Sequence, residues 1–190
     1  MDLFLTERQI QLQFDGQQSA IQPLTGGIPQ GSPISPILFL IYISYLVAKE
    51  GFQLSYIDDF SISVSSTSAA KNCKRLEEIC RGLFSTAKEI GANFAAEKTE
   101  LIHFSSKRTP ISEGITVGGY TVKPKPVIRW LGVYLDPKLS FKSHIQRKSL
   151  AASAAFSRIS GLGNSQKGLP IAALRQLYIT YISTIADFGS

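Results

Sequence analysis

Two adjacent aspartates, Asp58 and Asp59, lie within an otherwise apolar and serine-rich stretch and limit how that stretch can fold. Neighbouring carboxylates repel each other and are costly to bury, so they belong at an exposed turn rather than inside a core. Around them, residues 54–64 alternate, with apolar side chains at every second position from Phe60 to Val64 and serines between. The pattern predicts two short strands joined at the aspartates.

The paired carboxylates allow two interpretations. No lysine or arginine lies within five residues of them, so a divalent cation would offset their repulsion, and Mg²⁺ prefers one or two carboxylates together with substrate phosphates. The simpler alternative is a solvated acidic turn, since aspartate is a common turn former. The pair alone leaves both open.

A second constrained segment precedes the aspartates: residues 24–36 are rich in glycine, proline and serine and lead into an apolar run. Glycines allow close approach of a ligand to the backbone, prolines restrict the chain path, and a helix N-terminus favours phosphate. We expect a loop and then a helix that Ser35 caps, with Pro36 at its first position and Gly51 after its end. The apolar run, Ile37–Val47, has eleven residues, too few to span a bilayer.

Turn signals and periodicity place the other elements. Hairpin turns are expected at Asp15-Gly16 and Gly118-Gly119. Residues 68–90 have the apolar spacing of a helix, and Cys73 and Cys80 fall on its apolar stripe, which favours a role as small buried hydrophobes. Further strands are expected at 101–104 and 127–135, and helices at 140–160 and 170–187. This order predicts an α+β fold with a helical C-terminal part.

Composition narrows the class of partner. The chain has 190 residues and a net charge of +6, but residues 123–175 hold ten basic residues and one acid. A basic segment of net +9 beside a slightly acidic remainder suggests a polyanion partner such as nucleic acid or a membrane surface, with an ordinary solvated surface as the alternative. Two cysteines and two distant histidines exclude a disulfide scaffold and a zinc site of usual spacing. We expect an intracellular protein, in the nucleus or cytoplasm, with no signal peptide, transmembrane segment or membrane partner.

Taken together and in this order, the two constrained segments resemble a reverse transcriptase. Residues 27–39 (GIPQGSPISPILF) are similar to motif B of that family, and Tyr56-Ile57-Asp58-Asp59 is similar to the YxDD of motif C. Residues 93–104, with Lys98, resemble motif D, and residues 130–136 (WLGVYLD) resemble the LGxxLD segment of motif E. The final helices resemble the thumb of non-LTR (LINE-type) retrotransposon polymerases.

The resemblance implies an RNA-directed DNA polymerase that copies an RNA template from a DNA primer, using deoxynucleoside triphosphates and two Mg²⁺ ions, with Mn²⁺ as a substitute. Its implied catalytic residues are Asp58, Asp59 and Lys98, the two aspartates being the metal ligands and Lys98 neutralising phosphate or protonating the leaving group. The implied nucleotide-binding residues are Gln30, Gly31 and Tyr56. The implied nucleic-acid-binding residues are Trp130, Gly132, Lys142, Arg147 and Lys148.

The resemblance also implies a division into a palm portion, residues 1–136 with motifs B to E, and a helical thumb portion, residues 137–190. The palm portion should be an antiparallel sheet with helices. The family's motif A aspartate has no counterpart, because Asp2 lies on no convincing strand and Asp15 lies in a polar turn. We therefore expect fingers and motif A to lie upstream in the same polyprotein, and these residues alone to lack polymerase activity. The alternative is a non-catalytic, nucleic-acid-binding relic of a retroelement.

Overall fold

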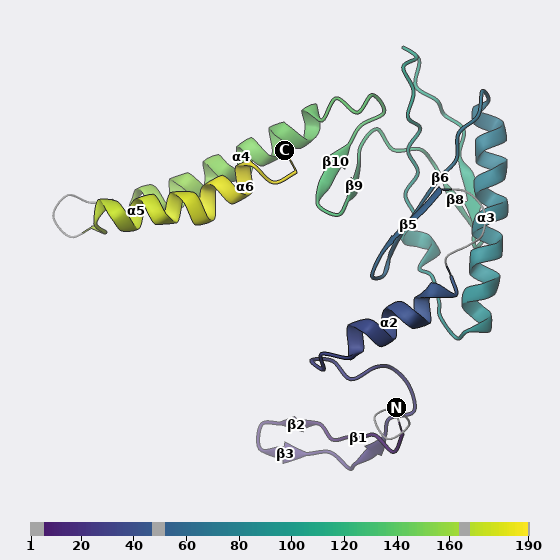
Figure 1. Cartoon of the computed structure of the whole chain (residues 1–190), viewed down its shortest axis with the longest axis horizontal. Helices are drawn as coiled ribbons and strands as arrows, with labels where there is room; N and C mark the ends of the chain where they lie inside the picture. The colour runs from purple at the N-terminus through teal and green to yellow at the C-terminus, as the bar shows by residue number, and fades with distance from the viewer. Residues whose placement is uncertain (1–5, 47–51, 164–167, 190) are drawn as a thin grey trace. The chain divides into compact units, whose positions relative to one another are not determined.

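The computed structural model describes residues 6–46, 52–163 and 168–189. The described residues fall into two compact units, the first within Met1–Val64 and Gly82–Asn93, the second within Ser65–Arg81 and Phe94–Ser190. The strands of the described residues pair into five two-stranded antiparallel sheets. Helices and small antiparallel sheets alternate along the chain, so the α+β prediction is confirmed at this level (Figure 1).

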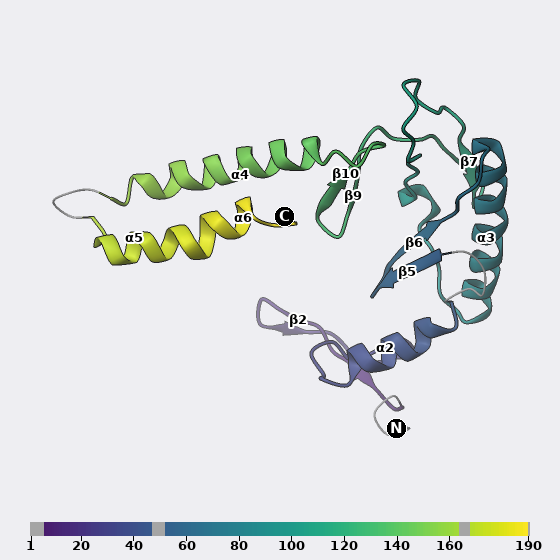
Figure 2. The same ribbon diagram turned by 45° about the horizontal axis from the view of Figure 1, so that its top comes forward.

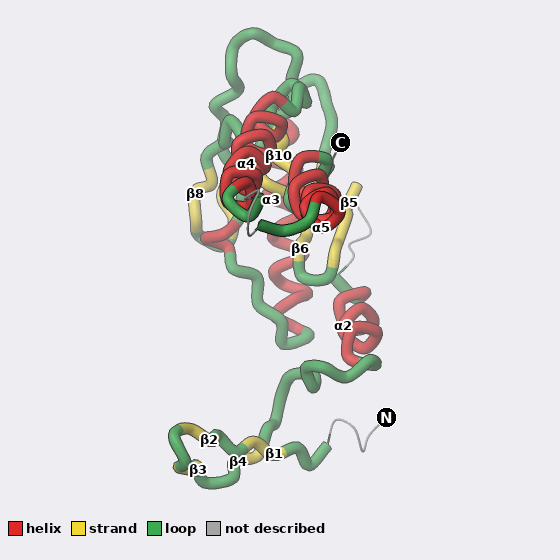
Figure 3. Tube along the Cα trace, turned by 90° about the vertical axis from the view of Figure 1, so that its left-hand side faces the viewer, coloured by secondary structure: helices red, strands yellow, loops and turns green. Residues whose placement is uncertain are grey.

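The first unit begins with a long, narrow hairpin, seen as a tube in Figure 3. Strand β1 (Gln9–Ile10) pairs with β4 (Gln22–Pro23), and β2 (Gln13–Phe14) pairs with β3 (Gln17–Gln18). Asp15 and Gly16, both at positive φ, form the turn, so the hairpin predicted there is confirmed. The strands are exposed on both faces.

Helix α2 (Ser35–Ser44) follows the loop of residues 24–34, but its first turn differs from the prediction. Ile34 is the N-cap residue, and no side chain caps the helix. The Ser35 hydroxyl instead donates to the Pro29 carbonyl at 2.5 Å, so it is engaged in closing the loop, and Pro36 moves to the second helical position. Gly51, the predicted end, lies outside the described residues.

Strands β5 (Phe52–Tyr56) and β6 (Asp59–Ser63) form the predicted hairpin. They pair in register from Phe52 with Ser63 to Tyr56 with Asp59, which leaves Ile57 and Asp58 as a two-residue loop. Helix α3 (Ala69–Glu89) begins after Ser68 and ends before Gly91, whose φ is +76°. These boundaries lie within one residue of those predicted.

The apolar stripe of α3 is buried as predicted, with Cys73, Ile79, Leu83 and Ala87 among the least exposed residues of the chain. Burial, reinforced by the carboxylates of Glu113 and Glu77, raises the pKa of the Cys73 thiol. Burial likewise raises that of Cys80. Both cysteines are therefore protonated, weakly reactive side chains that pack as hydrophobes.

The second unit contains two more hairpins. Strands β7 (Ile115–Val117) and β8 (Tyr120–Val122) turn at Gly118-Gly119 as predicted. The single strand predicted at 127–135 is wrong, because the segment folds back at Leu131-Gly132 into β9 (Ile128–Trp130) and β10 (Val133–Leu135). The strand predicted at 101–104 is also wrong: Leu101 makes one bridge, with Pro124, after the 3₁₀ turn η1 (Ala96–Lys98).

The C-terminal part is a pair of helices lying side by side (Figure 2). Helix α4 (Lys142–Ser160) packs against a second helical segment made of α5 (Ile171–Leu177), the π-helical η2 (Tyr178–Ser183) and α6 (Thr184–Ala186). Ala152, Ala155 and Ile182 form the buried core between them. The predicted helical hairpin is therefore confirmed, and among the described residues no helix combines the length and apolarity needed to cross a membrane.

Candidate functional site

The loop between β5 and β6 displays both aspartates. Asp58 is the second loop residue and Asp59 the first residue of β6, and both side chains are exposed. Ile57, the first loop residue, has a φ of +57°. A β-branched residue rarely adopts this conformation, and such strain is frequent at functional sites. Register and turn together therefore present two carboxylates at the tip of a hairpin that holds an unfavourable backbone angle.

The donor set at this tip fits a hard divalent cation in kind but not in number. Carboxylate oxygens are the ligands that Mg²⁺ prefers. Among the residues that the structure describes, however, no group of three or more histidine, cysteine or acidic side chains could hold a metal ion. Asp15 lies in the turn between β2 and β3, and Asp2 lies outside the described residues. A metal held by Asp58 and Asp59 would need further ligands from water, substrate or another segment.

The predicted nucleotide-binding residues of motif B lie in the same compact unit as the aspartates. Gln30 and Gly31 are exposed, in the loop before α2, and Gly31 has a φ of +87°. A Cβ added at Gly26, Gly27 or Gly31 would meet no atom within 4 Å, so this face of the loop is open. Tyr56 is 59% exposed beside the aspartates, at the end of β5.

The predicted motif D lysine lies elsewhere. Lys98 is exposed at the end of η1 and belongs to the second compact unit. Glu100, two residues after Lys98, forms an ion pair with Lys125 of the same unit at 2.5 Å. The structure therefore groups motif B with motif C in one unit and leaves motif D in the other.

The predicted nucleic-acid-binding residues gather around the β9–β10 hairpin and α4, all in the second unit. Arg147 lies with its guanidinium 4.6 Å from the centre of the Tyr134 ring, and Lys148 lies with its ammonium 3.9 Å from that of Phe188. Both cations thus stack on aromatic rings of their own unit. Lys142 is exposed at the first turn of α4.

Gly132 and Trp130, both predicted to bind nucleic acid, are not simply open surface residues. A Cβ on Gly132 would lie 2.8 Å from the Phe188 ring. Trp130 is half-buried on β9, and its buried indole nitrogen has no hydrogen-bond partner among the described residues. Because Gly132 has no Cβ, the Phe188 ring of the C-terminal segment can pack against the β9–β10 turn.

Sequence reasoning missed His144, a buried residue of α4 that joins three segments. Its Nδ1 accepts the Tyr134 backbone N–H at 3.2 Å, so the proton lies on Nε2, which donates to the Phe188 carbonyl at 2.7 Å. A lone histidine on an otherwise ordinary helix carries no local signal of this role. Only the contact among β10, α4 and residues 187–189 reveals it.

Sequence reasoning placed Asp136 in the motif E segment but missed its structural role, although aspartate is a common turn former whose side chain bonds nearby backbone N–H groups. Its carboxylate accepts the backbone N–H groups of Lys138, Ser140 and Phe141 and the Ser140 hydroxyl, at 2.9–3.1 Å. These bonds, chiefly that from the Ser140 N–H, lower the pKa of Asp136 below its usual value. They hold a turn in which Leu139 and Phe141 adopt positive φ and α4 begins.

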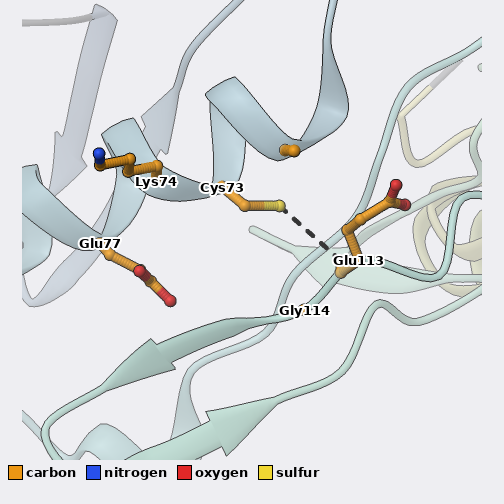
Figure 4. Close-up of a pocket in the computed structure, with 6 residues that line it drawn as sticks. Cys73, Lys74, Glu77, Glu113 and Gly114 are labelled. Carbon is orange, nitrogen blue, oxygen red and sulfur yellow. Dashed lines mark hydrogen bonds between the residues drawn. The ribbon is translucent and has the colours of Figure 1, made fainter.

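A shallow pocket lies at the N-terminal end of α3 and is lined by none of the predicted site residues (Figure 4). Cys73 donates weakly to the Glu113 carbonyl at 3.9 Å, and Glu77 accepts the Thr116 backbone N–H at 2.7 Å. Cys73 thus joins α3 to the segment before β7, and Glu77 joins α3 to β7 itself. The pocket is a shallow gap where these two elements pack together.

Comparison with known proteins identifies the family. Residues 2–135 match the family described as reverse transcriptase (RNA-dependent DNA polymerase). The match covers most of the chain and includes the hairpin with both aspartates and the motif B loop. The chain therefore belongs to the reverse transcriptase family, which confirms the resemblance inferred from motifs B and C.

Individual relatives support the LINE-type assignment. The chain is 26% identical over 195 residues to the "RNA-directed DNA polymerase from mobile element jockey" of Drosophila melanogaster, an alignment that covers 98% of the chain and 21% of the relative. It is 21% identical over 196 residues to the "Probable RNA-directed DNA polymerase from transposon BS" of the same species, covering 98% and 22%. The jockey protein of Drosophila funebris is 25% identical over 151 residues, covering 75% and 16%. The chain thus spans about a fifth of the length of these curated relatives.

Proposed function

We propose that this chain forms the C-terminal palm and the thumb of a non-LTR retrotransposon reverse transcriptase, with the palm in residues 1–136 and the thumb in residues 137–190. One observation carries the proposal: the exposed carboxylates of Asp58 and Asp59 belong to the same compact unit as the open Gln30-Gly31 loop. A polymerase site needs both features, a metal-binding pair and a surface that accepts a nucleotide. RNA template, DNA primer and deoxynucleoside triphosphates are the proposed substrates, so the activity would take place in the nucleus or cytoplasm.

Each of the predicted site residues would have its own role in the reaction. Asp58 would hold the catalytic metals, with Asp59 ligating or supporting beside it, and Gln30 and Gly31 would contact the nucleotide and template, with Tyr56 beside them. Two bound Mg²⁺ ions would supply activation of the primer hydroxyl and neutralisation of the triphosphate. Lys98 is the proposed source of a positive charge or a proton for the leaving group. Trp130 and Gly132 would support the primer end through the β9–β10 hairpin.

The proposed metal site can be tested on the chain directly with Mn²⁺ as a paramagnetic probe. We expect Mn²⁺ to broaden the backbone NMR signals of residues 56–60, and the double variant Asp58→Asn/Asp59→Asn to lose that broadening. Asp15, an exposed turn aspartate on another hairpin, is an internal control, because one carboxylate is a poor site. Equal broadening at Asp15 and at residues 56–60 would overturn the metal assignment.

Catalysis should need a third ligand, because the described residues bring no third carboxylate to the pair. We therefore expect purified chain to give no extension of primed RNA with deoxynucleotides and Mg²⁺. Extension that Asp58→Ala abolishes would contradict this expectation and show that the two aspartates suffice.

That the described residues bring no third carboxylate to the pair also favours a second candidate, a relic that binds nucleic acid without catalysis. In either case α4 would contact the phosphate backbone, and Lys142 is the cleanest position to test because Arg147 and Lys148 also stack on rings. Lys142→Gln should weaken duplex binding and lower the slope of log affinity against log salt by about 1. Lys88→Gln on α3 is the charge-matched control. Duplex binding unaffected by Asp58→Asn, together with no Mn²⁺ site, would favour the relic.

A further inference from the structure

The open loop of residues 24–34 depends on hydrogen bonds at its ends for its shape. Gly27 and Gly31 adopt positive φ and are exposed, and a Cβ at either would meet no atom within 4 Å. A short glycine-rich segment loses much conformational entropy when it is ordered. The contacts that anchor the loop therefore decide whether Gln30 and Gly31 are held in a single conformation.

Arg8 supplies one anchor. Its Nη2 donates to two successive carbonyls of the loop, to Gly26 at 3.0 Å and to Gly27 at 2.7 Å. The backbone of Arg8 is itself held, because its carbonyl accepts the Leu24 N–H at 2.7 Å beside the β1–β4 pair. A guanidinium on an anchored backbone thus holds the loop at its first two glycines.

Ser35 supplies the other anchor through its hydroxyl bond to the Pro29 carbonyl, one residue before Gln30. In the sequence, Gln30 and Gly31 therefore follow the two carbonyls that Arg8 binds and precede Ser35, the first residue of α2, which binds the Pro29 carbonyl. Charge-assisted bonds from a planar guanidinium restrict direction as well as distance, which a single neutral bond does less well.

We propose that Arg8 is the positioning residue for the nucleotide-binding loop: it orders residues 26–31 without touching the nucleotide. The inference rests on the proposed function for the identity of the ligand. Ordering before binding removes part of the entropic penalty of association, so the guanidinium raises nucleotide affinity from a distance.

The first measurement reports the loop alone. Backbone ¹⁵N relaxation of the chain should give order parameters near ~0.85 at Gly26, Gly27 and Gly31, falling below ~0.6 in Arg8→Gln. Arg8→Lys, which keeps the charge but not the planar guanidinium, should give intermediate order parameters. Gln11→Ala is the matched control, since it removes a bond of 3.0 Å to the Ser19 carbonyl on the same hairpin without reaching the loop. Unchanged amide signals of α3 show that each variant is folded.

The second measurement reports function, with dTTP and Mg²⁺ as the probe. We expect Arg8→Gln to raise the dissociation constant about fivefold or more, Arg8→Lys to restore part of the affinity, and Gln11→Ala to leave it unchanged. A loop that is equally ordered in wild type and Arg8→Gln, or that loosens with no change in dTTP affinity, would overturn the inference. If wild type binds no dTTP, the proposed function fails, and the order parameters alone then decide whether Arg8 anchors the loop.

Discussion

Gly132 offers the sharpest test of the contact between the β9–β10 hairpin and the C-terminal segment. Its φ is +85°, and a Cβ there would lie 2.8 and 2.9 Å from two atoms of the Phe188 ring. Gly119 occupies the same place in the β7–β8 turn with a φ of +86° but has no atom within 4 Å of such a Cβ. The two glycines therefore share a backbone strain and differ in the clash.

The magnitudes follow from this difference. Placing alanine in the left-handed region costs about 1–2 kcal/mol at either site. At Gly132 the outer edge of the Phe188 ring must also swing away, which breaks its contact with the Lys148 ammonium at 3.9 Å. Losing that cation–π contact adds about 0.5–1 kcal/mol. We expect Gly132→Ala to destabilise by roughly 1.5–3 kcal/mol and Gly119→Ala by roughly 1–2 kcal/mol.

The assay is thermal unfolding followed by the fluorescence of Trp130, the single tryptophan of the chain, two residues from Gly132. For a chain of this size the extra 0.5–1 kcal/mol corresponds to a midpoint lower by about 1–4 °C than that of Gly119→Ala. In a Phe188→Ala background the difference between the two glycine variants should vanish. Equal midpoints in the wild-type background, or a difference that survives Phe188→Ala, would refute the contact.

Three further predictions concern single positions. Ile57→Gly relieves a positive φ at a half-exposed side chain, so amide exchange in β5 and β6 should slow roughly two- to fivefold; faster exchange would contradict the strain. Gly82 lies within α3, and a Cβ there would meet no atom within 4 Å. Gly82→Ala should therefore raise the free energy of unfolding, measured by urea denaturation, by about 0.5–1 kcal/mol, and a lower free energy of unfolding would contradict the open site. Asp136 has a lowered pKa when folded, so its stabilisation is complete above about pH 4 and declines as pH falls through the folded pKa; the stability gap between wild type and Asp136→Asn should narrow from pH 6 to pH 3, and a constant gap would argue against the ionised carboxylate.

The turns show where local sequence sufficed and where it failed. Asp15-Gly16 and Gly118-Gly119 are residue pairs that accept positive φ readily, and both turns formed where predicted. Leu131 also adopts positive φ, at +46°, which its side chain disfavours, so no local rule anticipated the third turn. There the Phe188 ring packs against the turn glycine, and tertiary contact outweighs the preference of one residue.

The helix starts show the same division. The role of Asp136 in the turn before α4 could have been predicted in principle, because its bonds reach only a few residues along the chain. Ser35 looked like a cap for α2 by the same logic, yet its hydroxyl closes the preceding loop. As a cap the Ser35 oxygen would accept a backbone N–H of the helix, but the path of the loop places the Pro29 carbonyl where the hydroxyl donates to it instead.

Motif chemistry was readable without a structure because it depends on residue types at short spacing. The adjacent aspartates, the GIPQGS loop and the family they indicate all follow from the order of residues, and the family match covers them. Tertiary structure alone revealed three sets of contacts: Arg8 on the glycine carbonyls of the motif B loop and, in the other unit, His144 between Tyr134 and Phe188 and the Phe188 ring against Gly132. Phe188 lies more than forty positions from both His144 and Gly132, and Arg8 lies nearly twenty positions from the glycines it binds. At such separations local spacing does not predict which residues come into contact.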